Sequence, residues 1–158
     1  MFDLGLRICV STQDLPLPNG ARTYQGDLTY YNPGLGACGV SATDNDAVVA
    51  VAHATFDAVQ TGSDPNQNPL CGRKIRARRV DQRTGKSVSI DVTVIDRCKS
   101  CELSWNMHAQ SEDKFTEYST DFMLGTGCEP TDIDVSPAMF EKMADPSLGR
   151  VPVTWAWL

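Results

Sequence analysis

Three features are scarce or missing in this chain of 158 residues, and each absence argues against a class of function. No stretch approaches the roughly 20 apolar residues that a membrane-spanning helix requires. Only two histidines are present, and no second CxxC pair accompanies Cys98 and Cys101, so neither a metal site nor a cofactor is predicted. A net charge of -6 disfavours a nucleic-acid partner, because polyanions attract basic surfaces. We therefore expect no metal, cofactor, membrane or nucleic-acid partner.

The amino terminus and the cysteine content point in different directions. Residues 1–5 lack a charged segment followed by an apolar one, so no secretion signal is visible. Six cysteines in so short a chain nevertheless favour disulfides and a secreted, extracellular protein. A misassigned first exon would reconcile the two observations. With 41% apolar residues, the chain can fill one modest core, so we expect one folded domain and a monomer.

Short β-strands separated by turns dominate the chain after an extended or disordered arm over residues 1–25. Alternating polar and apolar residues, or runs of branched apolar ones, predict strands over residues 27–31, 72–80, 87–95 and 151–157. Residues 48–52 fit a buried strand or a tightly packed helical turn. Ser136 and Pro137 are typical of a helix start, which predicts a short helix to residue 143. The sequence therefore predicts a closed or nearly closed β-barrel over residues 26–158.

Four segments in fixed order resemble the double-psi β-barrel proteins, which include expansins, fungal loosenins, barwin-like proteins and rare lipoprotein A. They are GDLTYY with GACG (26–31 and 36–39), VAVAH (49–53), VTVIDRC (92–98) and DIDVSP (132–137). NPLCG at 68–72 and LGRVPVTW at 148–155 strengthen the likeness to the short fungal branch. The resemblance implies an all-β fold, a six-stranded double-psi β-barrel with one or two short helices.

The resemblance also implies a polysaccharide-binding groove. Asp96 and Asp134 match two aspartates that converge there, and Thr29 and Tyr31 match polar and aromatic residues of the first strand. Tyr30 is a further candidate for stacking on a sugar ring, although strand alternation places one of the two tyrosines in the core. The structural alternative for each aspartate is an end-of-strand cap, or an ion pair with Arg97 or Arg150.

A glycosidase of the usual kind needs two carboxylates. In the related family-45 endoglucanases the base follows the first-strand aromatic residues, and that position here is Asn32, whose amide cannot accept a proton from water. Asp134 matches the general acid. The resemblance thus implies that the acid is kept and the base is lost, so we assign no catalytic residue and keep Asp134, Asp96 and His53 as candidates only.

His53 follows an apolar run, which favours a packing role. Its functional alternative comes from rare lipoprotein A, where a matching histidine and the aspartate matching Asp96 serve peptidoglycan cleavage. The acidic partner of that histidine would fall at Ala42, with Asp44 and Asp46 only nearby, so lytic activity is disfavoured. Trp155 and Trp157 share one strand face, and we expect both to be buried rather than to form a sugar platform.

Residues 99–125 have no counterpart in the short fungal relatives. Joining Cys98 directly to Thr126 restores the family pattern DRCTGCEP, and the codons at both junctions can be written with intron boundary signals. We hypothesise a translated intron, and the alternative is a genuine long loop. If this stretch and the arm are both misassigned, Cys38, Cys71, Cys98 and Cys128 remain as disulfide cysteines, with three possible pairings.

The sequence therefore favours a secreted, non-hydrolytic protein that binds and loosens cell-wall polysaccharide, which would be cellulose, chitin or a related glycan. Two alternatives stay open. Some small members of this barrel superfamily inhibit papain-like cysteine proteases through surface loops. A residual glycan-cleaving enzyme, either a lytic transglycosylase or one like the family-45 endoglucanases, is the other.

Overall fold

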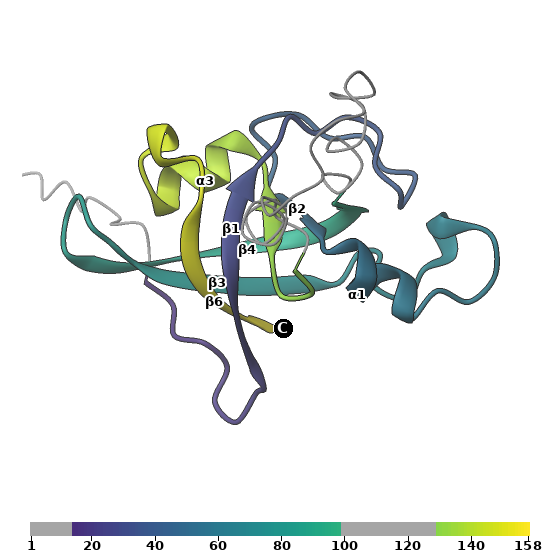
Figure 1. Cartoon of the computed structure of the whole chain (residues 1–158), viewed down its shortest axis with the longest axis horizontal. Coiled ribbons are helices and arrows are strands. Elements are labelled where there is room, and N and C mark those ends of the chain that lie inside the picture. The colour runs from purple at the N-terminus through teal and green to yellow at the C-terminus, as the bar shows by residue number, and fades with distance from the viewer. Residues whose placement is uncertain (1–13, 99–128) are drawn as a thin grey trace, which may run out of the picture.

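The computed structural model describes residues 14–98 and 129–158, whose six strands close into a barrel (Figure 1). Around the barrel the strands follow the order β1-β5-β2-β4-β3-β6. Their bounds are β1 (Thr23–Tyr30), β2 (Val48–Val51), β3 (Lys74–Asp81), β4 (Lys86–Arg97), β5 (Ile133–Val135) and β6 (Val151–Trp157). The described residues also form two short helices, α1 (His53–Ala58) and α3 (Pro137–Met143), and the 3-10 turns η1 (Pro65–Gln67) and η2 (Pro146–Leu148). The predicted all-β barrel with one or two short helices is confirmed.

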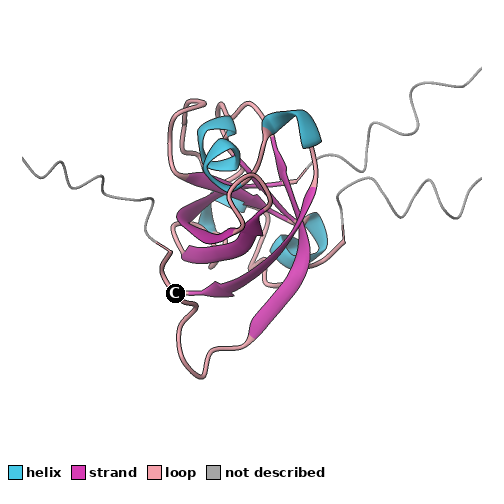
Figure 2. Cartoon of the chain, turned by 90° about the vertical axis from the view of Figure 1, so that its left-hand side faces the viewer, coloured by secondary structure: helices cyan, strands magenta, loops and turns pink. Residues whose placement is uncertain are grey.

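The barrel mixes parallel and antiparallel pairs. β1 pairs with β5 and β2 pairs with β4 in parallel, and the other neighbours are antiparallel. Because β5 inserts between β1 and β2, segments more than 70 residues apart become neighbours. In Figure 1 α3 lies beside β1, whereas α1 lies at the other side of the barrel. Figure 2 shows from a second side that the helices lie around the strands.

Large apolar side chains from every part of the described chain fill that interior. Trp155, Phe56, Phe140, Leu28 and Ile75 are among the largest fully buried ones. Burying a side chain of this size contributes about 1.5–3 kcal/mol, so the core accounts for much of the stability. The indole nitrogen of Trp155 donates to the carbonyl of Thr131 at 2.8 Å, which satisfies its only polar atom.

The two terminal tryptophans have different environments. Trp155 is buried, as expected, and stacks against Tyr24 with 4.5 Å between ring centroids. Trp157 stays partly exposed, and the guanidinium of Arg73 lies 4.2 Å from the centre of its ring. The expectation that both are buried is therefore wrong for Trp157. Arg73 covers the ring, which supports the view that it is no open sugar platform.

The first strand begins earlier than the sequence indicated. β1 starts at Thr23, four residues before the strand predicted over residues 27–31, and ends at Tyr30. Thr23 pairs with Ala156 of β6, so the last residues of the chain extend the ladder that starts this strand. Upstream of β1, the amide of Leu15 donates to Ser89 at 2.8 Å. Residues 1–13, which make up half of the predicted arm, lie outside the described residues.

One disulfide is formed among the described residues, between Cys38 and Cys71, with Cα atoms 5.6 Å apart. It is one of the pairings that the sequence left open. Cys98, at the end of β4, is buried. Cys128 and the hypothetical intron over residues 99–125 lie outside the described residues. No helix among the described residues is long and apolar enough to cross a membrane.

Candidate functional site

Three of the predicted groove residues lie in one row across four neighbouring strands. Ala50 of β2 is in register with Asp134 of β5 on one side and with Asp96 of β4 on the other. Thr29 of β1 is in register with Asp134 and extends the row by one strand. Since adjacent strands lie about 4.8 Å apart, the backbones of the two aspartates are separated by about 10 Å. The structure thus brings Thr29, Asp134 and Asp96 together, as predicted.

A β-bulge in β4 allows Asp96 to join this row. Val49 is in register with Val94, but the next residue, Ala50, is in register with Asp96, so Ile95 is an extra residue in β4. Val49 and Val94 both belong to the contiguous hydrophobic cluster, whereas Ala50, although buried, and Asp96 do not. If Ile95 were paired regularly and the register did not shift, strict alternation would put Asp96 on the core face with Val94. The bulge therefore turns the carboxylate out of the core.

Asp134 is a mostly buried carboxyl with a single hydrogen-bond donor among the described residues. The hydroxyl of Thr29 donates to its Oδ1 at 3.0 Å. Burial raises the pKa of Asp134 from 3.8 to about 6 and the charge of Asp96 adds to the effect, although Thr29 and Arg150 oppose it. A carboxyl with this pKa changes its charge in mildly acidic solution. It can donate or accept a hydrogen bond near that pH.

Asp96 is more firmly held. It is 8% exposed, and its Oδ1 accepts hydrogen bonds of 2.8 Å from the backbone amides of Ala37 and Arg97. The structural alternative, an end-of-strand cap, is thus partly realised. No hydrogen bond from a described residue to its Oδ2 is formed, so that oxygen can accept one from a ligand.

The ion pairs considered as the alternative role of both aspartates are not formed. Arg97 binds Asp57 of α1 at 2.7 Å instead. Arg150 binds Asp27 at 2.9 Å and approaches Asp132 to 3.7 Å. Neither Asp96 nor Asp134 forms a salt bridge with any described residue.

Asp27, Asp132 and Arg150 form a cluster that sequence reasoning missed. The amide of Asp27 donates to Asp132 at 2.8 Å, and Arg150 joins both carboxylates. A signal was present, because Asp27 and Asp132 lie two residues before Thr29 and Asp134 and so share their strand faces. The cluster continues the polar row along β1 and β5.

Tyr31 brings a buried polar atom to the site. Its hydroxyl is inaccessible and has no hydrogen-bond partner among the described residues. Burial, helped by the charges of Asp96 and Asp134, raises the pKa of Tyr31, so the hydroxyl stays protonated. A buried hydroxyl without a partner costs about 1–3 kcal/mol, so this atom lowers the stability of the fold beside the row.

Tyr30 does not belong to the row. Its ring packs on Phe140 of α3, with centroids 4.7 Å apart, and its hydroxyl donates to the carbonyl of Pro146 at 3.1 Å. It follows Thr29 directly in the chain, and alternation turns it to the other face of the strand. The structure thus favours Tyr31 over Tyr30 as the aromatic residue of the site.

His53 lies at the start of α1 with its side chain 53% exposed, so the expected packing role is wrong. Its Nε2 lies 2.8 Å from Asp57, one helical turn later. Asp44, the acid considered upstream, instead accepts two hydrogen bonds of 3.1 Å from the amide of Asn32. Among the described residues no group of acidic, cysteine or histidine side chains could hold a metal ion.

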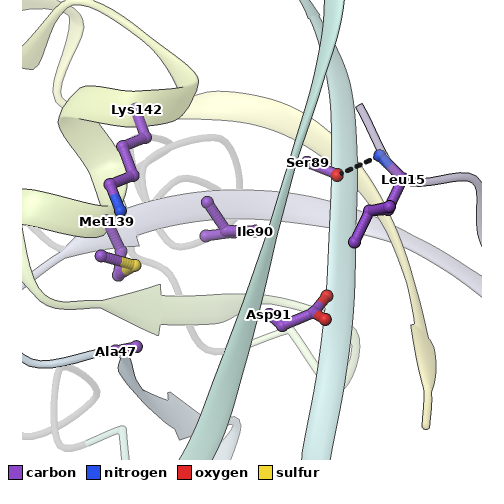
Figure 3. Close-up of a pocket in the computed structure, with 7 residues that line it drawn as sticks. All are labelled: Leu15, Ala47, Ser89, Ile90, Asp91, Met139 and Lys142. Carbon is purple, nitrogen blue, oxygen red and sulfur yellow. Dashed lines mark hydrogen bonds between the residues drawn. The ribbon is translucent and has the colours of Figure 1, made fainter. Parts of the chain in front are cut away.

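A separate small pocket lies between α3 and β4 (Figure 3). The hydrogen bond from the Leu15 amide to Ser89 closes one side of it. None of its lining residues belongs to the row of Thr29, Asp134 and Asp96, so it is a distinct feature. The residues around it are Leu15, Ala47, Ser89, Ile90, Asp91, Met139 and Lys142.

No family model and no curated protein match the chain. Solved structures do. A papain inhibitor from Streptomyces superposes with a TM-score of 0.58 at 28% identity, over 90% of this chain and 99% of the inhibitor. An expansin from Clavibacter michiganensis superposes with TM-scores of 0.53 in its apo form and 0.54 as a point mutant in complex with cellohexaose. Those identities are 19% and 17%, over 87% of this chain and 50% of the expansin. These proteins share the double-psi type of barrel with this chain.

Proposed function

We propose that the protein is a secreted, non-hydrolytic binder and loosener of cell-wall polysaccharide. The observation that carries this proposal is the row of Thr29, Asp134 and Asp96, in which neither carboxylate has a cationic partner among the described residues. Sugars present closely spaced hydroxyl groups that both donate and accept hydrogen bonds, and carboxylates bind such groups strongly. An expansin with the same barrel type has been solved with cellohexaose, which makes a glucan a reasonable ligand class.

The mechanism follows from which atoms are free to bind. Oδ2 of Asp96 accepts from one sugar hydroxyl, and Asp134 exchanges a hydrogen bond with a second. Each bond replaces one that the glycan makes to a neighbouring chain. Binding of this kind separates packed polysaccharide chains without breaking a covalent bond.

Hydrolysis is not part of the proposal, because a second carboxylate in the role of base is missing at the expected place. Asn32 stands there, and its amide nitrogen donates to Asp44. A neutral amide cannot remove a proton from water, so Asp134 is left as an acid without a base. The disulfide between Cys38 and Cys71 supports a secreted protein, since such bonds persist in oxidising compartments.

The test is a pull-down of the full chain with cellulose and with chitin, with reducing ends assayed in the same tubes. Asp134→Asn is the site variant, and Asp91→Asn on the outer face of β4 is the matched control. We expect binding that weakens about tenfold in Asp134→Asn, is unchanged in Asp91→Asn and releases no sugar. Equal binding by all three proteins would refute the site, and release of reducing ends would refute the non-hydrolytic mechanism.

A second function is favoured by one comparison. The papain inhibitor from Streptomyces matches over almost its whole length at 28% identity. This chain also exposes two apolar side chains in the loop between β1 and β2, namely Leu35 at 71% and Val40 at 49% exposure. Exposed apolar side chains on a well-ordered loop suit insertion into a protease cleft.

Inhibition of papain by the purified chain tests this second function. If the loop carries it, the double variant Leu35→Ser/Val40→Ser raises the inhibition constant at least about tenfold, because two apolar anchors are removed. Val80→Ser, at a site of 54% exposure in β3, is the control and leaves inhibition unchanged. Absence of inhibition by the unaltered chain would eliminate this function.

A further inference from the structure

The loop between β1 and β2 is attached to the bulged end of β4 at consecutive residues. The amide of Cys38 donates to the carbonyl of Ile95 at 3.0 Å, and the amide of Ala37 donates to the carboxylate of Asp96 at 2.8 Å. One loop segment thus contacts both the extra residue of the bulge and the carboxylate that follows it.

Gly36 makes this close approach possible. A Cβ atom at Gly36 would collide with the carbonyl oxygen of Ile95, which is a backbone atom and cannot move aside as a flexible side chain would. Gly34, two residues earlier in the same loop, has no heavy atom within 4 Å of the position where its Cβ would lie. The contact with β4 is therefore confined to one short stretch of the loop.

The disulfide ties this stretch to a second attachment point on β4. Cys71, the partner of Cys38, is followed by Gly72, whose amide donates to the carbonyl of Val94 at 2.9 Å. Two loops that are 33 residues apart in sequence are therefore joined covalently where each one binds residues 94–96 of β4. Asp96 lies directly beneath this junction.

From this arrangement we propose that the Cys38–Cys71 disulfide is a positioning element for Asp96. It holds the Ala37 amide against one carboxylate oxygen, which fixes the orientation of the carboxylate and leaves the other oxygen for a ligand. The consequence for binding rests on the function proposed above, whereas the positioning itself does not. When the disulfide is absent, Asp96 keeps only the hydrogen bond from the Arg97 amide and rotates more freely.

Two variants release the loop in different ways. Cys38→Ser/Cys71→Ser removes the covalent link, and Gly36→Ala keeps the link but pushes the loop away from Ile95. Gly34→Ala is the matched control, since it adds the same methyl group where there is space. Near-ultraviolet circular dichroism establishes that each variant keeps its packed barrel, and Gly36→Ala decides the question if the cysteine variant does not fold.

The first readout is amide hydrogen exchange, which requires no ligand. We expect exchange at Ala37 to accelerate at least about tenfold in both release variants and to stay slow in Gly34→Ala. The amide of Val94, which donates to Arg73 at 2.8 Å within the barrel, should stay slow in all of them. Unchanged protection of Ala37 in both release variants would overturn the proposal.

The second readout is polysaccharide binding, combined with Asp96→Asn in a double-mutant cycle. We expect the release variants to bind polysaccharide about fivefold more weakly than the unaltered chain. We also expect Asp96→Asn to weaken binding by a smaller factor in the release variants than in the unaltered chain. The positioning role would be overturned if the binding losses of the release variants and of Asp96→Asn were fully additive. It would also be overturned if a release variant with fast exchange at Ala37 bound as well as the unaltered chain. If the unaltered chain binds no polysaccharide, the proposed function fails, and hydrogen exchange alone decides the positioning.

Discussion

The hairpin of β3 and β4 and the row formed by Thr29, Asp134 and Asp96 differ in whether their carboxylates have cationic partners. In the hairpin, Arg76 binds Asp91 through two hydrogen bonds of 2.7 and 2.8 Å, and Arg83 in the connecting turn binds Asp81 at 2.9 Å. In the row, Asp134 has no cationic partner among the described residues and carries a raised pKa. Paired charges support the fold, whereas groups left incomplete cost stability and are free to bind.

The strongest test of this contrast is Asp134→Asn. The folded-state pKa of Asp134, about 6, lies above its ordinary value of 3.8, so folding favours the protonated form. The cost of the charged form is absent below about pH 4, grows as the pH rises and is complete above about pH 6. We expect the variant to be more stable by about 2 kcal/mol at pH 7.

Urea unfolding at pH 4 and pH 7 measures this effect. The gain in unfolding free energy of Asp134→Asn should shrink towards zero at pH 4, where the carboxyl of Asp134 in the unaltered chain is neutral, like the amide that replaces it. A variant that is less stable at pH 7 would show that the charge of Asp134 supports the fold, contrary to the comparison.

Asp81→Asn should act in the opposite direction. Hydrogen bonding by Arg83 lowers the pKa of Asp81, which is almost fully buried, so its charged form is stabilised in the fold. That contribution is present above about pH 4 and is lost as the pH falls through the lowered pKa. We expect the variant to lose about 1.5 kcal/mol at pH 7, measured by urea unfolding, with polysaccharide binding unchanged. A loss of binding in a folded variant would extend the site to the turn between β3 and β4.

Tyr31→Phe removes the unpartnered hydroxyl and keeps the ring. Since the buried hydroxyl lacks a hydrogen bond and is inaccessible to a ligand, its removal should raise the free energy of unfolding by about 1 kcal/mol and leave polysaccharide binding unchanged. Thermal unfolding and pull-down with the same preparation measure both effects. Tyr24→Phe, in a ring that stacks on Trp155 away from the row, is the control. Lower stability in Tyr31→Phe would mean that the hydroxyl supports the fold.

The smallest effect should come from Asp91→Asn. The pair with Arg76 is partly exposed to solvent, and such pairs contribute about 0.5 kcal/mol. We expect a shift of that size in urea unfolding, which decreases at high salt because ions screen the pair. A loss of unfolding free energy as large as that in Asp81→Asn would show that the contribution of an ion pair does not depend on its exposure to solvent.

Elements with a strong local pattern were predictable from the sequence. The branched residues of β4 indicated a strand over residues 87–95, and the structure extends it to Lys86–Arg97. The last strand occupies residues 151–157 as predicted, and the helix expected from Ser136 is α3. Local alternation and capping were sufficient here, because both act over only a few residues.

Features that depend on contacts distant in sequence were not predictable. The alternation of residues 90, 92 and 94 gave no sign that an extra residue would turn Asp96 outwards. The ion pairs of Arg97 and Arg150, which were considered only as an alternative role of Asp96 and Asp134, go instead to Asp57 and Asp27, and these reach them only after the barrel closes. Helix α1 was missed because its six residues are too few for a clear helical period.

The bulge at Ile95 has a genetic consequence. Loss of this one codon would restore a regular ladder in which Val94 stays opposite Val49 and Asp96 stays opposite Ala50, so the carboxylate would keep its face. The deletion would instead remove the carbonyl that accepts a hydrogen bond from the Cys38 amide. An alignment with such a relative would show full identity at the binding positions and a single gap beside them, and that gap would mark a changed loop attachment, not a lost carboxylate.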